Sequence, residues 1–512
     1  DVERYHFYNV MNRPLAELEG LLARVEAPGK PINWIGQSAR QSLGEVGVLN
    51  IPTPEINIEA WHRRPYGSRA YAICGITHTT ATATVMRTLP DLLVAPLEDY
   101  DALICTSSAV RESVETQLTA ARDYMRQEYG PRRRREPQRV TIPLGVNAAD
   151  FAARPDHRKA WRERLGIPAD GVVALYVGRF NVRSKMNPAL MAMALERSVQ
   201  RTGQPIWWVN SGWGATPEFE AEFHEESRKL CPSVHYCAVD GRPADVRFSI
   251  WSVADFFISF SDNVQETFGL TPIEAMAAGL PCVVSDWNGY KDTVRHGIDG
   301  FRVPTLAPRP GMGADLAYAF SNGWISYDNY VGAAGQTTVV DLDEAERLIS
   351  ALVTNEGRRR RLGDVAQKRV REAFDWSVII PQYQALWAEQ DARRRAAGPD
   401  VSPRDNPMRP DPFTLFANYP TRHLSRADRV QLRPGMTWQA AEARLEAPLA
   451  VYSRYNRPTL QEAQAVIAYL ADRPKVQVGE ILQQFPERRR AVVERGLLWL
   501  ARHDVIEILP DS

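Results

Sequence analysis

The sequence of 512 residues has few cysteines, no excess of charge of either sign and no long apolar run. Its five cysteines are odd in number and include no Cys-x-x-Cys pair, so a disulfide framework is excluded and reduced core thiols are expected. Lys plus Arg and Asp plus Glu both total 62, which gives no overall attraction to nucleic acid or to an anionic membrane. A signal peptide and an apolar stretch of about 20 residues are also missing, so no transmembrane helix is expected. The composition predicts a soluble, cytoplasmic protein and leaves a peripheral membrane contact open.

Two motifs of common enzymes are absent as well. No G-x-G-x-x-G follows a predicted strand with an acidic residue about 20 positions later, which disfavours a dinucleotide-dependent oxidoreductase. No cluster of His, Cys, Asp and Glu has the spacing of metal ligands, so neither a metal nor another cofactor is expected. The chain is too long for one ordinary core, and two or three domains are expected.

The most informative stretch runs from Gln265 to Pro281 and reads QETFGLTPIEAMAAGLP. Its two glutamates, Glu266 and Glu274, stand eight positions apart, the first on a loop after an apolar strand and the second just inside a predicted helix. Thr271 and Pro272, ahead of Glu274, have the pattern of an N-cap, a proline at the first helical position and a capping box. On this interpretation the stretch is only a well-started helix and Glu266 is an ordinary loop acid.

The same geometry also suits an anion. A loop of small residues that runs into a helix N-terminus presents unpaired N–H groups and the positive end of the helix dipole, which favour a phosphate. Gly269 lets the backbone come close to such a ligand. Because carboxylates are poor phosphate ligands, Glu266 and Glu274 are better placed to accept hydrogen bonds from hydroxyl groups on either side of it. A sugar, a diphosphate and a ribose supply groups in that order.

This stretch resembles the C-terminal domain signature of retaining glycosyltransferases of the family 4 type, two-domain enzymes that transfer a sugar from a nucleotide-sugar donor. The motif of that family is two glutamates with seven residues between them, and Glu266 and Glu274 match it. The resemblance implies that Glu266 contacts the donor sugar and that Glu274 contacts the ribose hydroxyls. The surroundings match at Gly269, Pro272, Ala275, Met276, Gly279 and Pro281. The backbone of Phe268, Gly269, Leu270 and Thr271 is then expected to contact the sugar and phosphates.

Two cations precede this motif. Arg179 follows the apolar run Val172–Gly178, a buried type of strand, and Lys185 comes six positions later. Cations at the carboxyl edge of a parallel strand lie where such sheets bind ligands. In the family an arginine and a lysine at these places hold the donor diphosphate, so Arg179 and Lys185 are candidate catalytic residues for a site without metal. The spacing is one residue longer than the common form, so Arg183 is the alternative to Lys185, and surface cations on a polar loop are the simpler interpretation.

The first part of the chain is less typical of the family. Its best strand, Tyr71–Ile76, ends just before His78, where a side chain can enter a cleft between domains. In the family a histidine in the matching loop contacts the donor sugar near the reaction centre, whereas a histidine that caps the next helix is an equally good interpretation. His62 is a weaker rival for the acceptor pocket. The chain opens with Tyr5–Val10, without the initial strand and glycine-rich loop of the family, so we expect either a missing upstream segment or a reduced start of the domain.

Further apolar runs alternate with helical stretches, which predicts a parallel sheet covered on both faces. Ser211–Gly214 reads as a turn at the ligand edge of that sheet, so Gly212 is a further donor-binding candidate, although a plain strand-to-helix turn needs the same glycines. Arg139–Asn147 resembles the last strand and exit turn of the first domain in the family. Arg358–Arg361 is most simply the exposed continuation of the helix that starts at Leu342.

The resemblance implies an α/β protein of the GT-B type, with two Rossmann-like domains that face each other across a cleft, and the sequence adds a mainly helical C-terminal module. Prolines and charged residues after Ala397 favour a linker. The expected parts are an N-terminal acceptor-side domain (1–150), a donor domain (151–375) with an insertion rich in Gly, Pro and aromatic residues (306–340), a crossover helix that returns to the first domain (376–397), a linker (398–412) and a helical, winged-helix-like module (413–512).

The sequence therefore predicts a glycosyltransferase that moves a sugar from a nucleoside-diphosphate sugar to an acceptor hydroxyl, with retention of configuration and without metal. The expected partners are this donor and a carbohydrate, lipid-linked or protein acceptor. The alternative is a non-catalytic nucleotide-sugar-binding or regulatory protein that acts through its C-terminal module. The arginine run Arg488–Arg490 is compatible with DNA binding. The module has neither aromatic stacking platforms nor a basic stripe, so we expect it to bind no nucleic acid. We expect residues 413–512 to form a homo-oligomer or partner contact instead.

Overall fold

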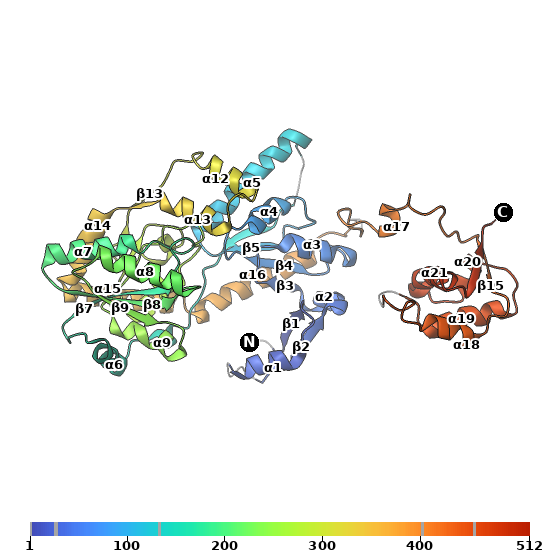
Figure 1. Cartoon of the computed structure of the whole chain (residues 1–512), viewed down its shortest axis with the longest axis horizontal. Coiled ribbons are helices and arrows are strands. Elements are labelled where there is room, and N and C mark those ends of the chain that lie inside the picture. Colours follow the sequence, from blue (N-terminus) through green and yellow to red (C-terminus); the bar gives the residue numbers. More distant parts are fainter. Residues whose placement is uncertain (1–2, 25–28, 132–134, 401–403, 454–456, 512) are drawn as a thin grey trace. The chain divides into compact units, whose positions relative to one another are not determined.

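The computed structural model describes residues 3–24, 29–131, 135–400, 404–453 and 457–511 (Figure 1). The chain divides into two compact units, of which the first ends at Asn406 and the second begins at Pro407. Each unit is treated by itself below. Among the described helices, none combines the length and the apolar character that a membrane span requires.

The larger sheet of the first unit has six parallel strands. Its central strands are mainly apolar because helices cover both faces. The chain order places the first three strands on one side and the next three on the other, so the order reverses between β7 and β10. The strands are β7 (Val172–Arg179), β8 (Ile206–Trp213), β9 (His235–Asp240), β10 (Phe256–Ser259), β11 (Cys282–Ser285) and β12 (Gly300–Val303), in the order β12-β11-β10-β7-β8-β9.

Two cores lie on the two faces of this sheet, because successive side chains of a strand point to opposite sides. Val173 and Leu175 of β7 pack into one core, and Ala174 and Tyr176 pack into the other. The first core is shared with α6 (Pro155–Leu165), α9 (Ala244–Ser249), α10 (Leu270–Ala277) and α15 (Glu356–Ala373). The second is shared with α7 (Ala189–Thr202), α8 (Pro217–Leu230) and α14 (Leu342–Val353). A short helix, α11 (Tyr290–Thr293), follows β11.

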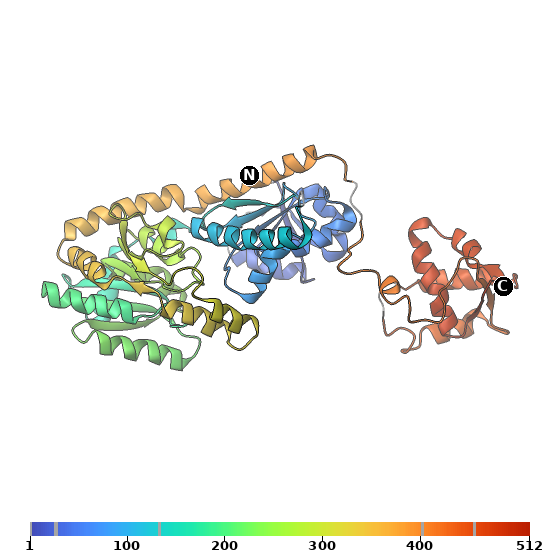
Figure 2. The same ribbon diagram turned by 90° about the horizontal axis from the view of Figure 1, so that it is seen from above.

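A second parallel sheet, of four strands, precedes it in the chain. The strands are β3 (Val48–Ile51), β4 (Ala72–Ile76), β5 (Ala102–Cys105) and β6 (Gln138–Thr141), in that order across the sheet. One face is covered by α3 (Ile56–Arg63), α4 (Ala83–Asp91) and α5 (Ser108–Tyr129), with the short α2 (Leu43–Val46) at its edge. The other face receives α16 (Trp376–Ala396), which follows α15 and lies along this sheet (Figure 2). The predicted α/β fold with parallel sheets is confirmed.

The structure corrects two details of the sequence interpretation. Residues Tyr5–Asn9 form a strand, β1, which pairs in parallel with β2 (Ile32–Gly36) and is joined to it through α1 (Leu15–Arg24), so the prediction that the chain opens without an initial strand is wrong. Aromatic packing of Phe7 on Tyr5 and Trp34 accompanies this strand. In the stretch Arg139–Asn147, expected as a strand and its exit turn, the strand part ends at Thr141. Arg358–Arg361 belongs to α15, which Asn355 caps anew, and does not continue α14.

The insertion expected over residues 306–340 is a compact segment with two helices. Its ends are joined by β13 (Thr305–Leu306) and β14 (Val339–Val340), which pair antiparallel. Between them lie α12 (Ala314–Ser321) and α13 (Tyr327–Gln336), which stack the rings of Phe320 and Tyr330 at 4.4 Å between centroids. The segment therefore leaves and returns to the first unit at one point.

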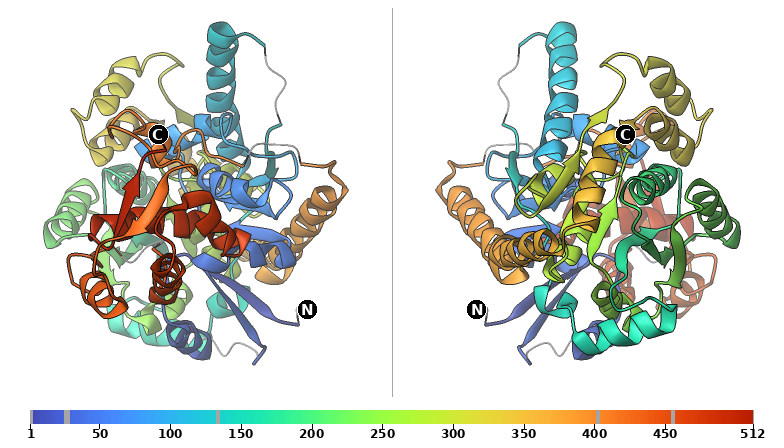
Figure 3. Two further views of the ribbon diagram at one scale, coloured as in Figure 1. Left: turned by 90° about the vertical axis from the view of Figure 1, so that its right-hand side faces the viewer. Right: turned by 90° about the vertical axis from the view of Figure 1, so that its left-hand side faces the viewer.

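The second unit has its own core of helices and three antiparallel strands (Figure 3, left). Thr459 and Glu462 form a reciprocal capping box at the start of its longest apolar helix, α19. Of the predicted linker, residues 401–403 lie outside the described residues, and a helical turn already begins at Pro412. The helices are α17 (Pro412–Leu415), α18 (Trp438–Leu445), α19 (Leu460–Ala471), α20 (Val478–Gln483) and α21 (Glu487–Arg502), and the strands are β15 (Arg429–Leu432), β16 (Val476–Gln477) and β17 (Ile506–Leu509).

A buried ion pair fixes the N-terminal sheet. Arg63 at the end of α3 and Asp101 before β5 are both 0% exposed and are joined by two hydrogen bonds of 2.7 Å. Asp101 also accepts hydrogen bonds from the backbone N–H groups of Ile73 and Glu98, each at 2.8 Å. The carboxylate thus connects β4, β5 and α3 at one point.

Substitution of Asp101 by Asn should destabilise the protein strongly, because it leaves the Arg63 charge buried without a partner. We expect the free energy of unfolding to fall by about 3–5 kcal/mol, measured by urea denaturation. Asp99→Asn is the matched control, since the Asp99 side chain is 63% exposed and should change stability little. Equal denaturation midpoints for the two variants would contradict the structural role of the pair.

Candidate functional site

The site predicted from the sequence lies where the strand order of the six-stranded sheet reverses. The carboxyl ends of β7 and β10 are neighbours there, since the two strands pair in parallel. Arg179 ends β7, Lys185 lies on the loop that follows, and Glu266 lies on the loop after β10. Parallel sheets of this order bind ligands at this edge, outside the carboxyl ends of the strands. The fold therefore brings these three predicted residues to one place.

Lys185 and Glu266 form an ion pair at the centre of the site. The Nζ and Oε2 atoms are 2.5 Å apart, and the side chains are 21% and 10% exposed. Burial lowers the pKa of Lys185, but the Glu266 carboxylate outweighs this and the net shift is upward. Burial raises the pKa of Glu266, but Lys185 outweighs this and the net shift is downward. Both groups therefore stay charged near neutral pH.

Arg183, the alternative to Lys185, is turned elsewhere. Its guanidinium lies over the ring of Phe219, with 5.4 Å between the central carbon and the ring centroid. Its backbone carbonyl accepts a hydrogen bond of 2.6 Å from the Asn263 amide. The structure thus places Lys185 beside Glu266 and uses Arg183 to join two loops.

Arg179 is exposed and is held by a residue that the sequence interpretation did not single out. In the orientation that satisfies both of its ends, the Gln265 amide donates to the Ser184 carbonyl at 2.6 Å and accepts from Arg179 at 3.2 Å. Gln265 directly precedes Glu266, so only its place beside the motif could have pointed to it. The charge of Arg179 remains directed toward solvent at the ligand edge.

The start of α10 differs from the predicted capping box. Gly269 occupies the N-cap position with φ of +90°, and no side chain caps the helix. Because glycine adopts this backbone conformation readily, the chain enters the helix at Leu270, and Thr271 is already inside the first turn. A side chain at Gly269 would also collide with the Tyr290 ring, 2.2 Å from the Cβ position. The first N–H groups of α10 therefore have no side-chain cap, as an anion site requires.

Glu274 is accordingly free of the capping role. Its side chain lies in the second turn of α10 and is half-buried. Burial raises its pKa to about 7, while Arg247 and Lys185 act in the opposite direction. Of the predicted donor-binding backbone, Phe268 has its side chain in the core, at 1% exposure, and Leu270 is 41% exposed. Phe268 is therefore packed into the protein, whereas Leu270 faces solvent.

The end of β10 and the loop that follows it are held by hydrogen bonds from the end of β11 and the segment after it. The Ser285 hydroxyl donates to the Ser261 carbonyl at 2.6 Å, and the Trp287 indole donates to the Asn263 carbonyl at 3.0 Å. The Tyr290 hydroxyl shares a hydrogen bond of 2.9 Å with Ser259. Sequence patterns gave no sign of these braces.

His78 lies on the loop after β4, with an exposed side chain. Its backbone carbonyl accepts a hydrogen bond of 2.8 Å from the Thr267 hydroxyl, one residue after Glu266. The next helix, α4, is capped by Thr82, so the interpretation of His78 as a helix cap is wrong. His62, the rival histidine, belongs to α3 and contacts Glu59 within the same helix.

Gly212 belongs to β8 and not to a turn. The strand extends to Trp213, so the turn expected over Ser211–Gly214 is wrong for its first three residues. A Cβ at Gly212 would lie 1.8 Å from the carbonyl oxygen of Gly178, its partner on β7. The close approach of these two strands accounts for the glycine without a nucleotide.

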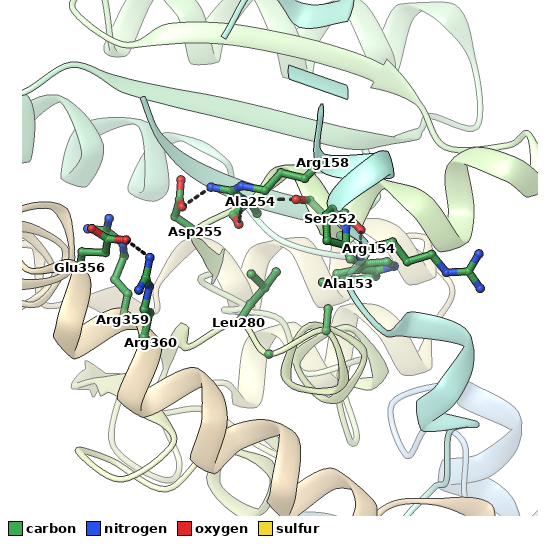
Figure 4. A pocket seen from close by; sticks show the side chains of 14 residues that line it. Ala153, Arg154, Arg158, Ser252, Ala254, Asp255, Leu280, Glu356, Arg359 and Arg360 are labelled. Carbon is green, nitrogen blue, oxygen red and sulfur yellow. Dashed lines mark hydrogen bonds and ion pairs between the residues drawn. The ribbon is translucent and has the colours of Figure 1, made fainter. Parts of the chain in front are cut away.

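Figure 4 shows another cavity, of about 370 Å³, at the opposite edge of the sheet, where Asp255 and Leu280 precede β10 and β11. Three of its four arginines bind the protein itself: Arg158 bonds Asp255 at 2.8 Å, and Arg360 bonds Glu356 at 2.5 Å. Arg359 donates to the carbonyls that end α14. We therefore assign these charges to packing. Within the described residues no group of three or more His, Cys, Asp or Glu side chains could hold a metal ion.

Replacement of Glu274 by Gln should change the pH dependence of stability. Since its folded pKa of about 7 lies above its ordinary value of 4.5, the contribution of Glu274 to stability is full below about pH 4.5 and is lost as pH rises through 7. The glutamine cannot ionise, so the variant should gain about 1–3 kcal/mol relative to the native chain between pH 5 and pH 8, measured by urea denaturation. Glu222→Gln on the exposed face of α8 is the control, and parallel pH profiles for both variants would refute the expectation.

Comparison with known proteins adds a family. Residues 157–308 match the model of glycosyl transferases group 1. The D-inositol 3-phosphate glycosyltransferase of Thermobispora bispora is 31% identical over 204 residues, which cover 38% of this chain and 45% of that protein. The putative glycosyltransferase EpsD of Bacillus subtilis is 27% identical over 161 residues, which cover 31% of this chain and 40% of that protein. The chain thus spans less than half the length of these two relatives.

Among solved structures, the chain is similar to Anabaena Alr3699/HepE in complex with UDP and glucose, with a TM-score of 0.48 and 16% identity over 72% of this chain and 88% of that one. It is also similar to sucrose-phosphate synthase from Thermosynechococcus elongatus, with a TM-score of 0.45 and 19% identity over 74% and 77% of the two chains. The matched residues 157–308 hold Arg179, Lys185 and both glutamates of the motif. Over these residues, the chain is similar to the glycosyl transferases group 1.

Proposed function

We infer that the protein is a glycosyltransferase that moves a sugar from a nucleoside-diphosphate sugar to an acceptor hydroxyl, with retention of configuration and without metal. The observation that carries this proposal is the meeting of Arg179, Lys185 and Glu266 at the carboxyl edge between β7 and β10, beside the uncapped start of α10. The cations suit the diphosphate of a nucleotide sugar, and the carboxylate suits the hydroxyl groups beside it.

The leaving diphosphate needs positive charge, because the bond from the anomeric carbon to its oxygen breaks and leaves that oxygen negative. Arg179 is exposed, and its Gln265 partner is neutral, so its full charge is available to the phosphates. Lys185 is shared with Glu266 at 2.5 Å and adds a second donor. The N–H groups at the start of α10 provide the rest. These fixed donors supply the charge stabilisation for which other enzymes use a divalent ion, which supports a site without metal.

The carboxylates are suited to the hydroxyl groups of the donor. Glu266 is held ionised by Lys185, so it can accept hydrogen bonds from sugar hydroxyls without losing its orientation. Glu274 lies in the second turn of α10 and is half-buried. We assign it to the ribose hydroxyls. His78 approaches through its loop, which Thr267 holds, and we assign it to the donor sugar on the acceptor side.

The activity is tested with purified full-length chain and a panel of nucleotide sugars, by measuring the release of nucleoside diphosphate with and without an acceptor mixture. Arg179→Ala, Lys185→Ala and Glu266→Gln should each lower kcat/KM by roughly 10²–10³-fold, because each removes charge stabilisation or orientation at the breaking bond. Lys229→Ala on the surface of α8 should leave turnover unchanged.

Four outcomes decide the parts of this proposal. Native turnover in all three site variants would refute the assignment of residues. Loss of activity with a chelator and its recovery on adding a divalent ion would refute the metal-free site. Inversion at the anomeric carbon of the first product, observed by NMR, would refute retention. Absence of turnover with every donor would favour the non-catalytic alternative.

A further inference from the structure

The insertion between β13 and β14 includes the helix α13 (Figure 1), which lines a cavity next to the candidate donor site. The cavity has a volume of about 340 Å³ and lies between α13, the loop after β7 and Asp262 on the loop after β10. This volume lies within the range of small-molecule sites in proteins. The insertion therefore adds a wall to a space that the two loops alone would leave open.

The wall of the cavity offers mainly hydrogen-bond acceptors and amides. Carboxylates come from Asp262 and Asp328, and amides come from Asn187, Asn329 and Gln336. The one cation of the lining, Arg183, has its guanidinium over the Phe219 ring. Two carboxylates in one cavity suit a ligand that brings several hydroxyl donors.

Asp262 is the deepest of these groups, at 5% exposure. Burial raises the pKa of its carboxyl to about 7, and the opposing influences are the backbone N–H groups of Asn187 and of Asp262 itself, with no cationic side chain among them. These backbone N–H groups satisfy part of the carboxyl group, and its remaining lone pairs can accept hydrogen bonds from a ligand in the cavity. None of the roles assigned to the donor site uses it.

The position of α13 links this cavity to both halves of the candidate site. The Asn263 amide donates to the carbonyls of Val331 on α13 and Arg183 on the loop after β7, at 3.3 and 2.6 Å. Gly332 brings the helix close, since a Cβ there would lie 3.4 Å from the Arg183 backbone. At the start of α13, the Tyr327 hydroxyl hydrogen-bonds Thr79, the residue after His78. The helix thus touches the donor loop and the loop that carries the candidate histidine.

We propose that this cavity is the subsite for a saccharide acceptor, in which the carboxylates of Asp262 and Asp328 accept hydrogen bonds from its hydroxyls. The proposal rests on the proposed function, since an acceptor presupposes transfer. The insertion then selects the acceptor, while Arg179, Lys185 and Glu266 serve the donor. A hydroxyl bound to a carboxylate adds a charge-assisted hydrogen bond, whose loss weakens binding by roughly 10-fold or more.

The test separates donor hydrolysis from transfer in the full-length chain. The donor is the nucleotide sugar that the native chain hydrolyses fastest, and the acceptors are a panel of methyl glycosides. Asp328→Asn removes the negative charge of this carboxylate. Ala333→Leu places a larger side chain in the cavity, on the side of α13 that lines it. Each should lower kcat/KM for the acceptor at least 10-fold and leave donor hydrolysis within about twofold of native. Asp315→Asn, on exposed α12 of the same insertion, is the matched control and should change neither rate.

Acceptor kcat/KM within twofold of native in both variants would overturn the proposal. Equal losses of hydrolysis and transfer would also overturn it, because the cavity would then serve the donor. If the native chain turns over no donor, the proposed function fails, and the cavity is tested alone by saturation-transfer NMR with the methyl glycosides. Signals lost in Ala333→Leu and kept in Asp315→Asn would support a saccharide subsite, whereas no signal, or signals unchanged in both, would overturn it.

Discussion

The loop between β10 and α10 carries the candidate chemistry, yet side chains from other segments hold it in place. Ser285 at the end of β11 and Trp287 after it donate to the loop, Tyr290 bonds Ser259 at the end of β10, and Lys185 reaches Glu266 from the loop after β7. Such external support is what a ligand-binding loop requires, since its own backbone groups must stay available to the ligand. The uncapped start of α10 meets the same requirement, because a side-chain cap would occupy the N–H groups that an anion needs.

Much of this site could be predicted from the sequence, for a reason specific to parallel sheets. The apolar runs that became β7 and β10 are recognisable locally, and the alternation of strands and helices forces their carboxyl ends to one edge. Arg179, Lys185 and Glu266 therefore meet although more than 80 residues separate the cations from the acid, as the 2.5 Å ion pair of Lys185 and Glu266 shows. The motif indicated which side chains could bind a ligand, and the parallel sheet brings these side chains close together.

The parts that could not be predicted depend on contacts between a side chain and a distant backbone. No periodicity marks that the Asn263 amide will join the loop after β7 to α13, or that Gln265 will orient Arg179. The capping pattern at Thr271 was misleading because the helix begins earlier, with Gly269 at its N-cap position. Gly269 has a positive φ, and a side chain there would collide with the Tyr290 ring. Gly212 was misplaced for a similar reason, since the approach of β7 and β8 is set by the whole sheet.

Thr267 has a consequence for how the two sheets of the first unit act together. Its hydroxyl donates to the His78 carbonyl at 2.8 Å, and its own carbonyl accepts from Ser107 at 2.7 Å. Because Thr267 is bonded covalently to Glu266, one peptide unit and one hydrogen bond set the distance between the acid of one sheet and the histidine loop of the other. The loops after β4 and β5 are thus held to the loop after β10 by the hydrogen bonds of Thr267.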